Sequence, residues 1–177
     1  MMTDANTNAG TAASAAGQAY EAGVAARLSK FTTYDRTDGA RTIQLPRPAL
    51  TYGNQTIIAD GWMPTLRTFV EVKGGDKDSI GSAYQKWYYH LHLIDEGVYL
   101  RALDGGLYDD DAPCGFLLVL AGTAADMIHT NRFFAAWSRH SAMYRREYRY
   151  AWCVREEAID LTLLQHIQTT VSGGYQA

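Results

Sequence analysis

The segment at residues 56–75, TIIADGWMPTLRTFVEVKGG, contains the pattern on which the predicted fold and chemistry of this chain depend. It reads as two short apolar strands joined by a Gly/Pro turn, with Asp60 ending the first strand and Glu71-Val72-Lys73 ending the second. Side chains alternate between the two faces of a strand, so Glu71 and Lys73 point to one face and Val72 to the other. If the segment folds back as a hairpin, Asp60 can lie close to the Glu71 and Lys73 side chains.

These three residue types suggest a particular chemistry. Two carboxylates brought together repel each other unless a cation lies between them, and carboxylate oxygens suit a hard ion such as Mg²⁺, or Mn²⁺ in its place. Lys73 could orient an attacking water or stabilise negative charge on a phosphate. The pattern therefore predicts metal-assisted hydrolysis of a phosphodiester bond. The alternative is a surface hairpin on which Glu71 and Lys73 form a solvated charge pair.

The spacing resembles the signature of the PD-(D/E)XK nuclease superfamily, in which an acidic residue is followed, after a gap, by (D/E)-x-K on the adjacent strand. Here Asp60 is followed by ten residues and then by Glu71-Val72-Lys73, while Ala59 stands where the signature usually has proline. The resemblance implies a restriction-endonuclease-like fold. It also implies that Asp60, Glu71 and the carbonyl of Val72 bind the metal and that Lys73 positions the water.

A helix is predicted over residues 80–94, where apolar residues recur at steps of three and four after a possible N-cap at Asp78-Ser79. Gln85 and Tyr89 lie one turn apart on this helix. An E-x-K strand followed by Q-x-x-x-Y resembles the RecB-like branch of the superfamily, which implies that Gln85 lies beside the metal site and that Tyr89 helps to hold DNA. Without the resemblance, Gln85 reads as a surface residue and Tyr89 as a core aromatic.

A second helix is predicted over residues 17–28, where Tyr20, Val24 and Leu28 are four apart. In several branches of the superfamily the helix before the sheet supplies an acidic residue to the metal site, so the resemblance makes Glu21 a further candidate ligand. A solvated helix carboxylate is the alternative. The RecB-like pattern often places a histidine near this position, and the sequence has none there.

The remaining segments predict one α/β domain. Residues 1–16, which are small and polar, read as a flexible tail; residues 17–171 form the domain, and residues 172–177 a C-terminal tail. The order of elements corresponds to an αβββαβ core with a mixed central sheet and additional C-terminal helices. Strands are expected at 42–45, 54–60, 66–73, 98–103, 115–121 and 147–154. Further helical segments are expected at about 124–144, after a turn at Gly122-Thr123, and at 156–168.

Charge is unevenly distributed along the chain, although the net charge is only −3. Arg145, Arg146 and Arg149 are interleaved with tyrosines, a combination that can pair with phosphates and stack on bases. We therefore expect these three arginines to contact nucleic acid; a soluble helix end or a subunit interface is the alternative. No apolar run is long enough to span a membrane, and the N-terminus lacks the apolar region of a secretory signal.

Together these observations predict a Mg²⁺-dependent deoxyribonuclease, endo- or exonucleolytic, with DNA as its partner. The residues leave open a restriction enzyme, a phage or repair nuclease, or a toxin domain delivered into a target cell and neutralised by an immunity protein; in the first cases the protein would be cytoplasmic. Cutting both strands of a duplex would favour a homodimer. The alternatives are a non-catalytic nucleic-acid-binding or assembly protein that retains the fold, and a fold outside the superfamily.

Overall fold

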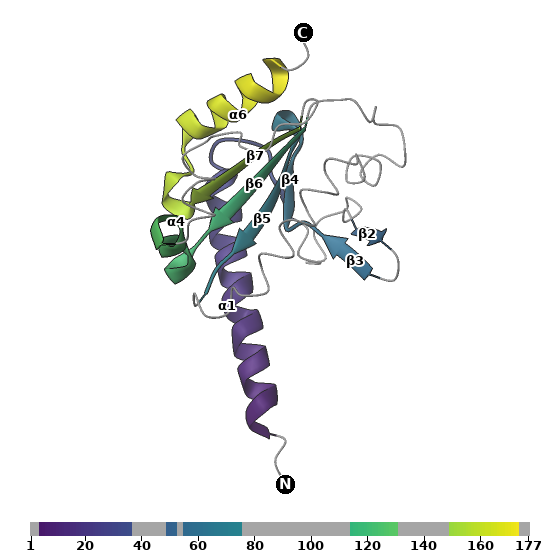
Figure 1. The fold of residues 1–177 in the computed structure, drawn as a ribbon, viewed down its shortest axis with the longest axis vertical. Helices are drawn as coiled ribbons and strands as arrows, with labels where there is room; N and C mark the ends of the chain where they lie inside the picture. The colour runs from purple at the N-terminus through teal and green to yellow at the C-terminus, as the bar shows by residue number, and fades with distance from the viewer. Residues whose placement is uncertain (1–3, 37–48, 53–54, 76–113, 131–148, 174–177) are drawn as a thin grey trace.

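The computed structural model describes residues 4–36, 49–52, 55–75, 114–130 and 149–173. Within these ranges, one mixed sheet of five strands has the order β1-β4-β5-β6-β7 and is accompanied by helices (Figure 1). Its strands are β1 (Asp35–Arg36), β4 (Gly61–Met63), β5 (Thr68–Lys73), β6 (Cys114–Leu120) and β7 (Arg149–Arg155). The predicted α/β class with a mixed sheet is confirmed.

The sheet combines an antiparallel half with a parallel half. β1, β4 and β5 pair antiparallel, whereas β5, β6 and β7 run parallel to one another. A short 3-10 turn, η1 (Pro64–Leu66), connects β4 to β5, and Arg67 completes the turn with a left-handed backbone, φ 47°. The ends of β5, β6 and β7 therefore lie at one edge of the sheet, where Lys73 is the last residue of β5.

Strand β6 is an interior strand of the sheet, and its residues from Phe116 to Leu120 are apolar. It pairs with β5 on one side and β7 on the other, and every residue from Phe116 to Leu120 is fully buried. A strand covered on both faces needs no alternation of polar and apolar residues. The prediction of a buried strand at residues 115–121 is confirmed, and so is that of a last strand near residues 147–154.

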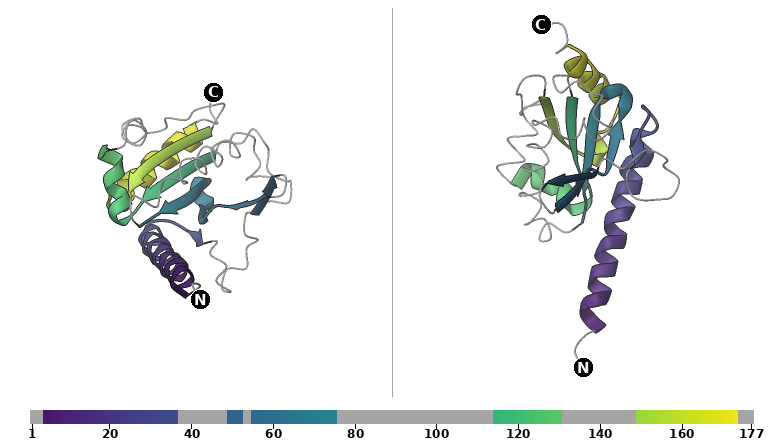
Figure 2. Two further views of the ribbon diagram at one scale, coloured as in Figure 1. Left: turned by 60° about the horizontal axis from the view of Figure 1, so that its bottom comes forward. Right: turned by 90° about the vertical axis from the view of Figure 1, so that its right-hand side faces the viewer.

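Helix α1 (Asp4–Leu28) packs on β5 through its C-terminal turns, where Val24 and Leu28 are fully buried. Its N-terminal part projects away from the sheet (Figures 1 and 2). The helix therefore begins well before the predicted start at residue 17, and residues 4–16 are helical where we expect a tail. The reason is local: this segment is rich in alanine, the residue with the highest helix propensity, although it has no apolar stripe.

Helix α6 (Leu161–Gly173) packs on the same face of the sheet as α1. Its buried residues Leu164, Ile167 and Val171 recur at steps of three and four, and they join the core cluster that contains Val24 and Val72. The expected helix at 156–168 starts later, because a 3-10 turn, η4 (Glu156–Ala158), comes first. Asp160 then accepts a hydrogen bond from the backbone N–H of Leu163 at 2.8 Å, as an N-cap does.

The prediction of a central strand at residues 54–60 is corrected. The segment expected to form a central strand at 54–60 contains β3 (Gln55–Ile58), which pairs with β2 (Ala49–Tyr52) in a separate two-stranded sheet. Tyr52 pairs with Gln55, so a two-residue Gly-Asn connection, a typical hairpin signal, favours this local pairing. The first described strand of the main sheet is β1, which lies outside all the expected strands.

Several predicted elements fall partly or wholly outside the described residues. These are the strands at 42–45 and 98–103 and the helix at 80–94. Of the turn expected at Gly122-Thr123 and the helical segment expected after it, to about residue 144, the structure describes η3 (Gly122–Asp126) and α4 (Met127–Thr130), where Ala124, Ala125 and Ile128 are buried. Within the described ranges, no helix is both long and apolar enough to cross a membrane.

Candidate active site

Asp60 lies against the Glu71-Val72-Lys73 strand as the sequence predicts, but it belongs to a different strand connection from the one expected. Asp60 directly precedes β4; it does not end the preceding strand. In the antiparallel pairing of β4 with β5, Gly61 lies opposite Val70, so the same register continued by one residue places Asp60 opposite Glu71. The Oδ2 oxygen of Asp60 accepts a hydrogen bond from the backbone N–H of Val72 at 2.7 Å. The first carboxylate is therefore fixed to the strand that carries the second.

Glu71 is the one buried charged side chain in the described part of the chain, with 3% of its surface exposed. It lies in the middle of the sheet, on a strand whose other residues from Thr68 to Val72 are also buried. Removing a carboxylate from water is costly unless a partner compensates its charge. Lys73, two residues further along the same face, forms an ion pair with Oε1 of Glu71. The solvated surface pair that we consider as the alternative is thereby excluded for Glu71.

The electrostatics of the site keep Lys73 charged. Burial by itself would lower the pKa of the Lys73 ammonium, but the negative charges of Glu71, Asp60 and Glu21 outweigh burial and raise it above its usual range. Lys73 is therefore a cation at neutral pH. It can hold a water molecule or a negatively charged oxygen, whereas it cannot accept a proton as a general base.

Glu21, on α1, contributes to the electrostatics of this site. Its negative charge helps to raise the pKa of Lys73, although 52 positions separate the two residues in the sequence. In the described ranges, no group of three or more His, Cys, Asp or Glu side chains is arranged to hold a metal ion. Within the described residues, Glu21, Asp60 and Glu71 therefore do not form a closed carboxylate cage.

The donor set fits a hard divalent ion of the Mg²⁺ type. Asp60 and Glu71 supply carboxylate oxygens from adjacent positions of one sheet, and Val72 adds a backbone carbonyl between Glu71 and Lys73. Mg²⁺ commonly takes only one or two protein carboxylates and keeps several waters, so it does not require a full protein cage.

The other predicted site residues are not placed. Gln85, Tyr89, Arg145 and Arg146 lie outside the described residues. Arg149 is the first residue of β7, and the structure describes its backbone only. Their roles stay predictions.

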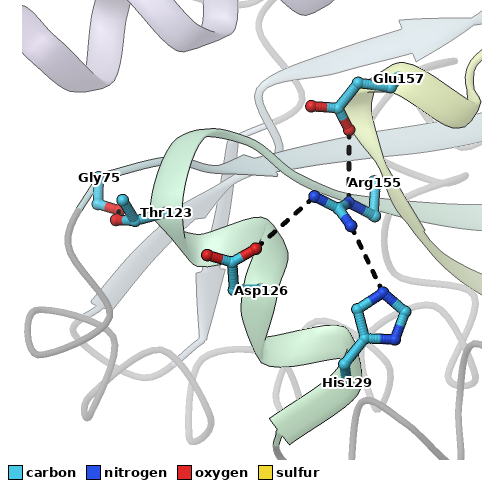
Figure 3. A network of polar contacts seen from close by, with 6 residues as sticks. All are labelled: Gly75, Thr123, Asp126, His129, Arg155 and Glu157. Atoms are coloured by element: carbon cyan, nitrogen blue, oxygen red, sulfur yellow. Dashed lines mark hydrogen bonds and ion pairs between the residues drawn. The ribbon is translucent and has the colours of Figure 1, made fainter.

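A second polar cluster, which the sequence analysis does not single out, surrounds Arg155 at the end of β7 (Figure 3). The Arg155 guanidinium lies 3.4 Å from Nε2 of His129, 3.6 Å from Oδ1 of Asp126 and 3.5 Å from Oε2 of Glu157. Two carboxylates face one guanidinium, so this cluster does not offer an excess of positive charge to an anion. Its members come from segments distant in sequence, and no spacing pattern could have identified it.

Comparisons with protein-family models, with curated proteins and with solved structures found no match.

Proposed function

We propose that this chain is a Mg²⁺-dependent deoxyribonuclease with a restriction-endonuclease-like fold. The observation that carries the proposal is the meeting of Asp60, Glu71 and Lys73 around one point of the sheet, with Val72 hydrogen-bonded to Asp60. Burying a carboxylate in an apolar strand costs free energy unless a counter-charge compensates it, and ionisable groups with shifted pKa values, such as Lys73, concentrate at functional sites. A divalent ion bound there would activate water and neutralise charge on the phosphate.

The order of elements supports the finer fold assignment. In the main sheet, α1 is followed by three antiparallel strands, β1, β4 and β5, and then by β6, which is parallel to β5; the separate β2–β3 hairpin lies between β1 and β4 in the chain. This is the αβββ…β arrangement that the resemblance implies. The helix between β5 and β6 is proposed from the sequence at residues 80–94, outside the described ranges.

In this proposal each residue has one role. Asp60 and Glu71 bind the metal, with the Val72 carbonyl as a further ligand and Glu21 as an additional acidic group. Lys73 stays protonated and orients the nucleophilic water or the scissile phosphate. Gln85 lies beside the metal, and Tyr89, Arg145, Arg146 and Arg149 contact DNA. A cytoplasmic nuclease, a delivered toxin with an immunity protein and a homodimer that cuts both strands all remain compatible with this site.

The test is cleavage of circular plasmid, linear single-stranded DNA and RNA with Mg²⁺ and with EDTA. Wild type is compared with Lys73→Ala and with Lys30→Ala, which removes an exposed lysine at the end of α1. We expect DNA cleavage that needs the metal, persists in Lys30→Ala and disappears in Lys73→Ala. Folded wild type that cuts none of these substrates with Mg²⁺ or Mn²⁺ would overturn the proposal in favour of a non-catalytic binding protein.

A further inference from the structure

The ring of Tyr20 lies across the ends of two neighbouring strands. Gly74 follows Lys73 at the end of β5, and Gly122 follows the end of β6. A Cβ atom placed on Gly74 would overlap the Tyr20 ring at Cδ2 and Cγ, and one placed on Gly122 would lie 2.6 Å from its hydroxyl oxygen. The ring therefore occupies the space that a side chain at either glycine would need.

The two glycines differ in what their backbones require. Gly122 has a φ of 61°, a left-handed conformation that favours glycine regardless of its neighbours. Gly74 does not have a positive φ, so backbone conformation does not explain its lack of a side chain. The close approach of the Tyr20 ring explains why a side chain does not fit at Gly74. Gly74 and Tyr20 thus form a fitted contact directly beside the candidate site.

The backbone under this contact is tied to the neighbouring strand. The N–H of Ala121 donates a hydrogen bond to the carbonyl of Lys73 at 2.9 Å. The hydroxyl of Thr123 donates to the carbonyl of Gly75, two residues beyond Lys73 (Figure 3). Tyr20 therefore rests on a braced surface, and together with the buried Val24 and Leu28 it holds the rotation of α1 about its own axis.

The next residue of α1 is Glu21, whose carboxylate interacts electrostatically with the Lys73 ammonium. Because successive residues of a helix keep a fixed angle to each other, a seated Tyr20 also sets the direction of Glu21. We propose that Tyr20 is a positioning residue, whose contact with Gly74 and Gly122 holds the Glu21 carboxylate at the Lys73 site. This inference rests on the proposed nuclease function for its kinetic consequence but not for its geometry.

The kinetic test uses Tyr20→Ala, Tyr20→Phe and Glu21→Gln, alone and combined, in plasmid cleavage with Mg²⁺. Misplacing a group that acts at a reaction centre can cost about 10- to 100-fold in rate. We expect Tyr20→Ala to lower kcat by about this factor with little change in KM, and Tyr20→Phe, which keeps the ring, to stay near wild type. In the Glu21→Gln background, Tyr20→Ala should lower kcat no further. Equal losses with and without Glu21, or a loss in Tyr20→Phe equal to that in Tyr20→Ala, would overturn the proposal.

A complementary variant tests the contact from the other side. Gly74→Ala should lower kcat as Tyr20→Ala does, and the double variant should be no worse than Tyr20→Ala, because the space is then vacant. Gly17→Ala is the matched control, since a Cβ there meets nothing within 4 Å. A double variant whose defect is the product of the two single defects would contradict the fitted contact.

A measurement without activity separates this proposal from the proposed function. In protein labelled with ¹³C-lysine, the ε-methylene resonance of Lys73 can be assigned by its loss in Lys73→Arg. We expect Glu21→Gln and Tyr20→Ala to shift this resonance in the same direction, while Tyr20→Phe and Gly17→Ala leave it unchanged. Were wild type inactive on all nucleic acids, these shifts would still decide the positioning role; a Lys73 resonance unmoved by Tyr20→Ala in folded protein would overturn it.

Discussion

Asp60 and Val72 are joined by a hydrogen bond of 2.7 Å between the side-chain Oδ2 and the backbone N–H, so an acidic residue of the candidate site also holds two segments of the sheet together. We expect Asp60→Ala, which leaves the Val72 N–H without this acceptor, to lower the free energy of unfolding by about 1–2 kcal/mol. Asp60→Asn removes the same charge but keeps an acceptor, and it should cost clearly less. Urea denaturation in EDTA measures both, and equal losses would contradict a role for the hydrogen bond.

The Glu71–Lys73 ion pair should be coupled energetically. Lys73→Met leaves a buried carboxylate without its counter-charge, and we expect a loss of about 1–3 kcal/mol, below the value for fully buried pairs because 24% of the Lys73 side chain is exposed. Adding Glu71→Gln should recover part of this loss. The double-mutant cycle in urea should give a coupling energy above about 1 kcal/mol. Additive losses would show that the two side chains act independently.

The pH dependence of stability follows from the direction of the Lys73 shift. Because the pKa of Lys73 is raised in the folded protein, its protonated form stabilises the fold at pH values below the ordinary lysine pKa, about 10.4. That contribution should disappear as the pH rises through the higher folded value. The difference in unfolding free energy between wild type and Lys73→Met should therefore be constant from neutral to mildly alkaline pH and shrink above about pH 10.4. A difference that grows with pH would reverse the sign of the interaction.

Cys153 lies in β7 with 3% of its surface exposed, and burial raises the pKa of its thiol. The thiolate is the reactive form, so the native protein should react slowly at this position. The sequence has two cysteines, and Cys114→Ser leaves Cys153 alone. We expect its reaction with a chromogenic disulfide to be at least about a hundredfold slower in native buffer than in concentrated urea. Comparable rates would mean that β7 opens readily.

Arg27 attaches α1 to the segment between β7 and α6. Its Nε donates to the carbonyl of Ile159 at 2.9 Å, and its Nη2 donates to the carbonyl of Glu157 at 2.7 Å. Arg27→Ala should lower the free energy of unfolding by about 1–2 kcal/mol, and lysine, which cannot reach both carbonyls in this way, should restore only part of it.

Arg155→Ala provides the comparison for Arg27→Ala. Arg155 makes longer ion pairs, 3.5 and 3.6 Å, with exposed carboxylates. Such pairs contribute at most about 1 kcal/mol, so urea denaturation should rank Arg27→Ala as the more destabilising change. The reverse order would mean that the Arg155 cluster contributes more to stability than α1 attachment does.

The local pattern of apolar residues predicted the elements whose buried faces produce that pattern. The apolar run of β6 fits a strand enclosed between two others, and the four-residue spacing of Val24 and Leu28 fits the buried stripe of α1. The pairing of strands within the sheets was predicted less well. The residues of β3 favour a strand, but they do not specify which strand it pairs with. In the structure β3 pairs with the nearby β2 and does not join the main sheet.

By itself, the sequence determined which residues carry the candidate chemistry, because the alternation of a strand places Glu71 and Lys73 on one face whatever lies around them. Only the tertiary structure decided that Asp60 contacts Val72, that Glu71 is buried and that Tyr20 rests on Gly74 and Gly122. Side-chain direction depends on neighbouring residues in the chain. Burial, pairing and the meeting of α1 with the ends of β5 and β6 depend on how distant segments pack, which no local pattern encodes.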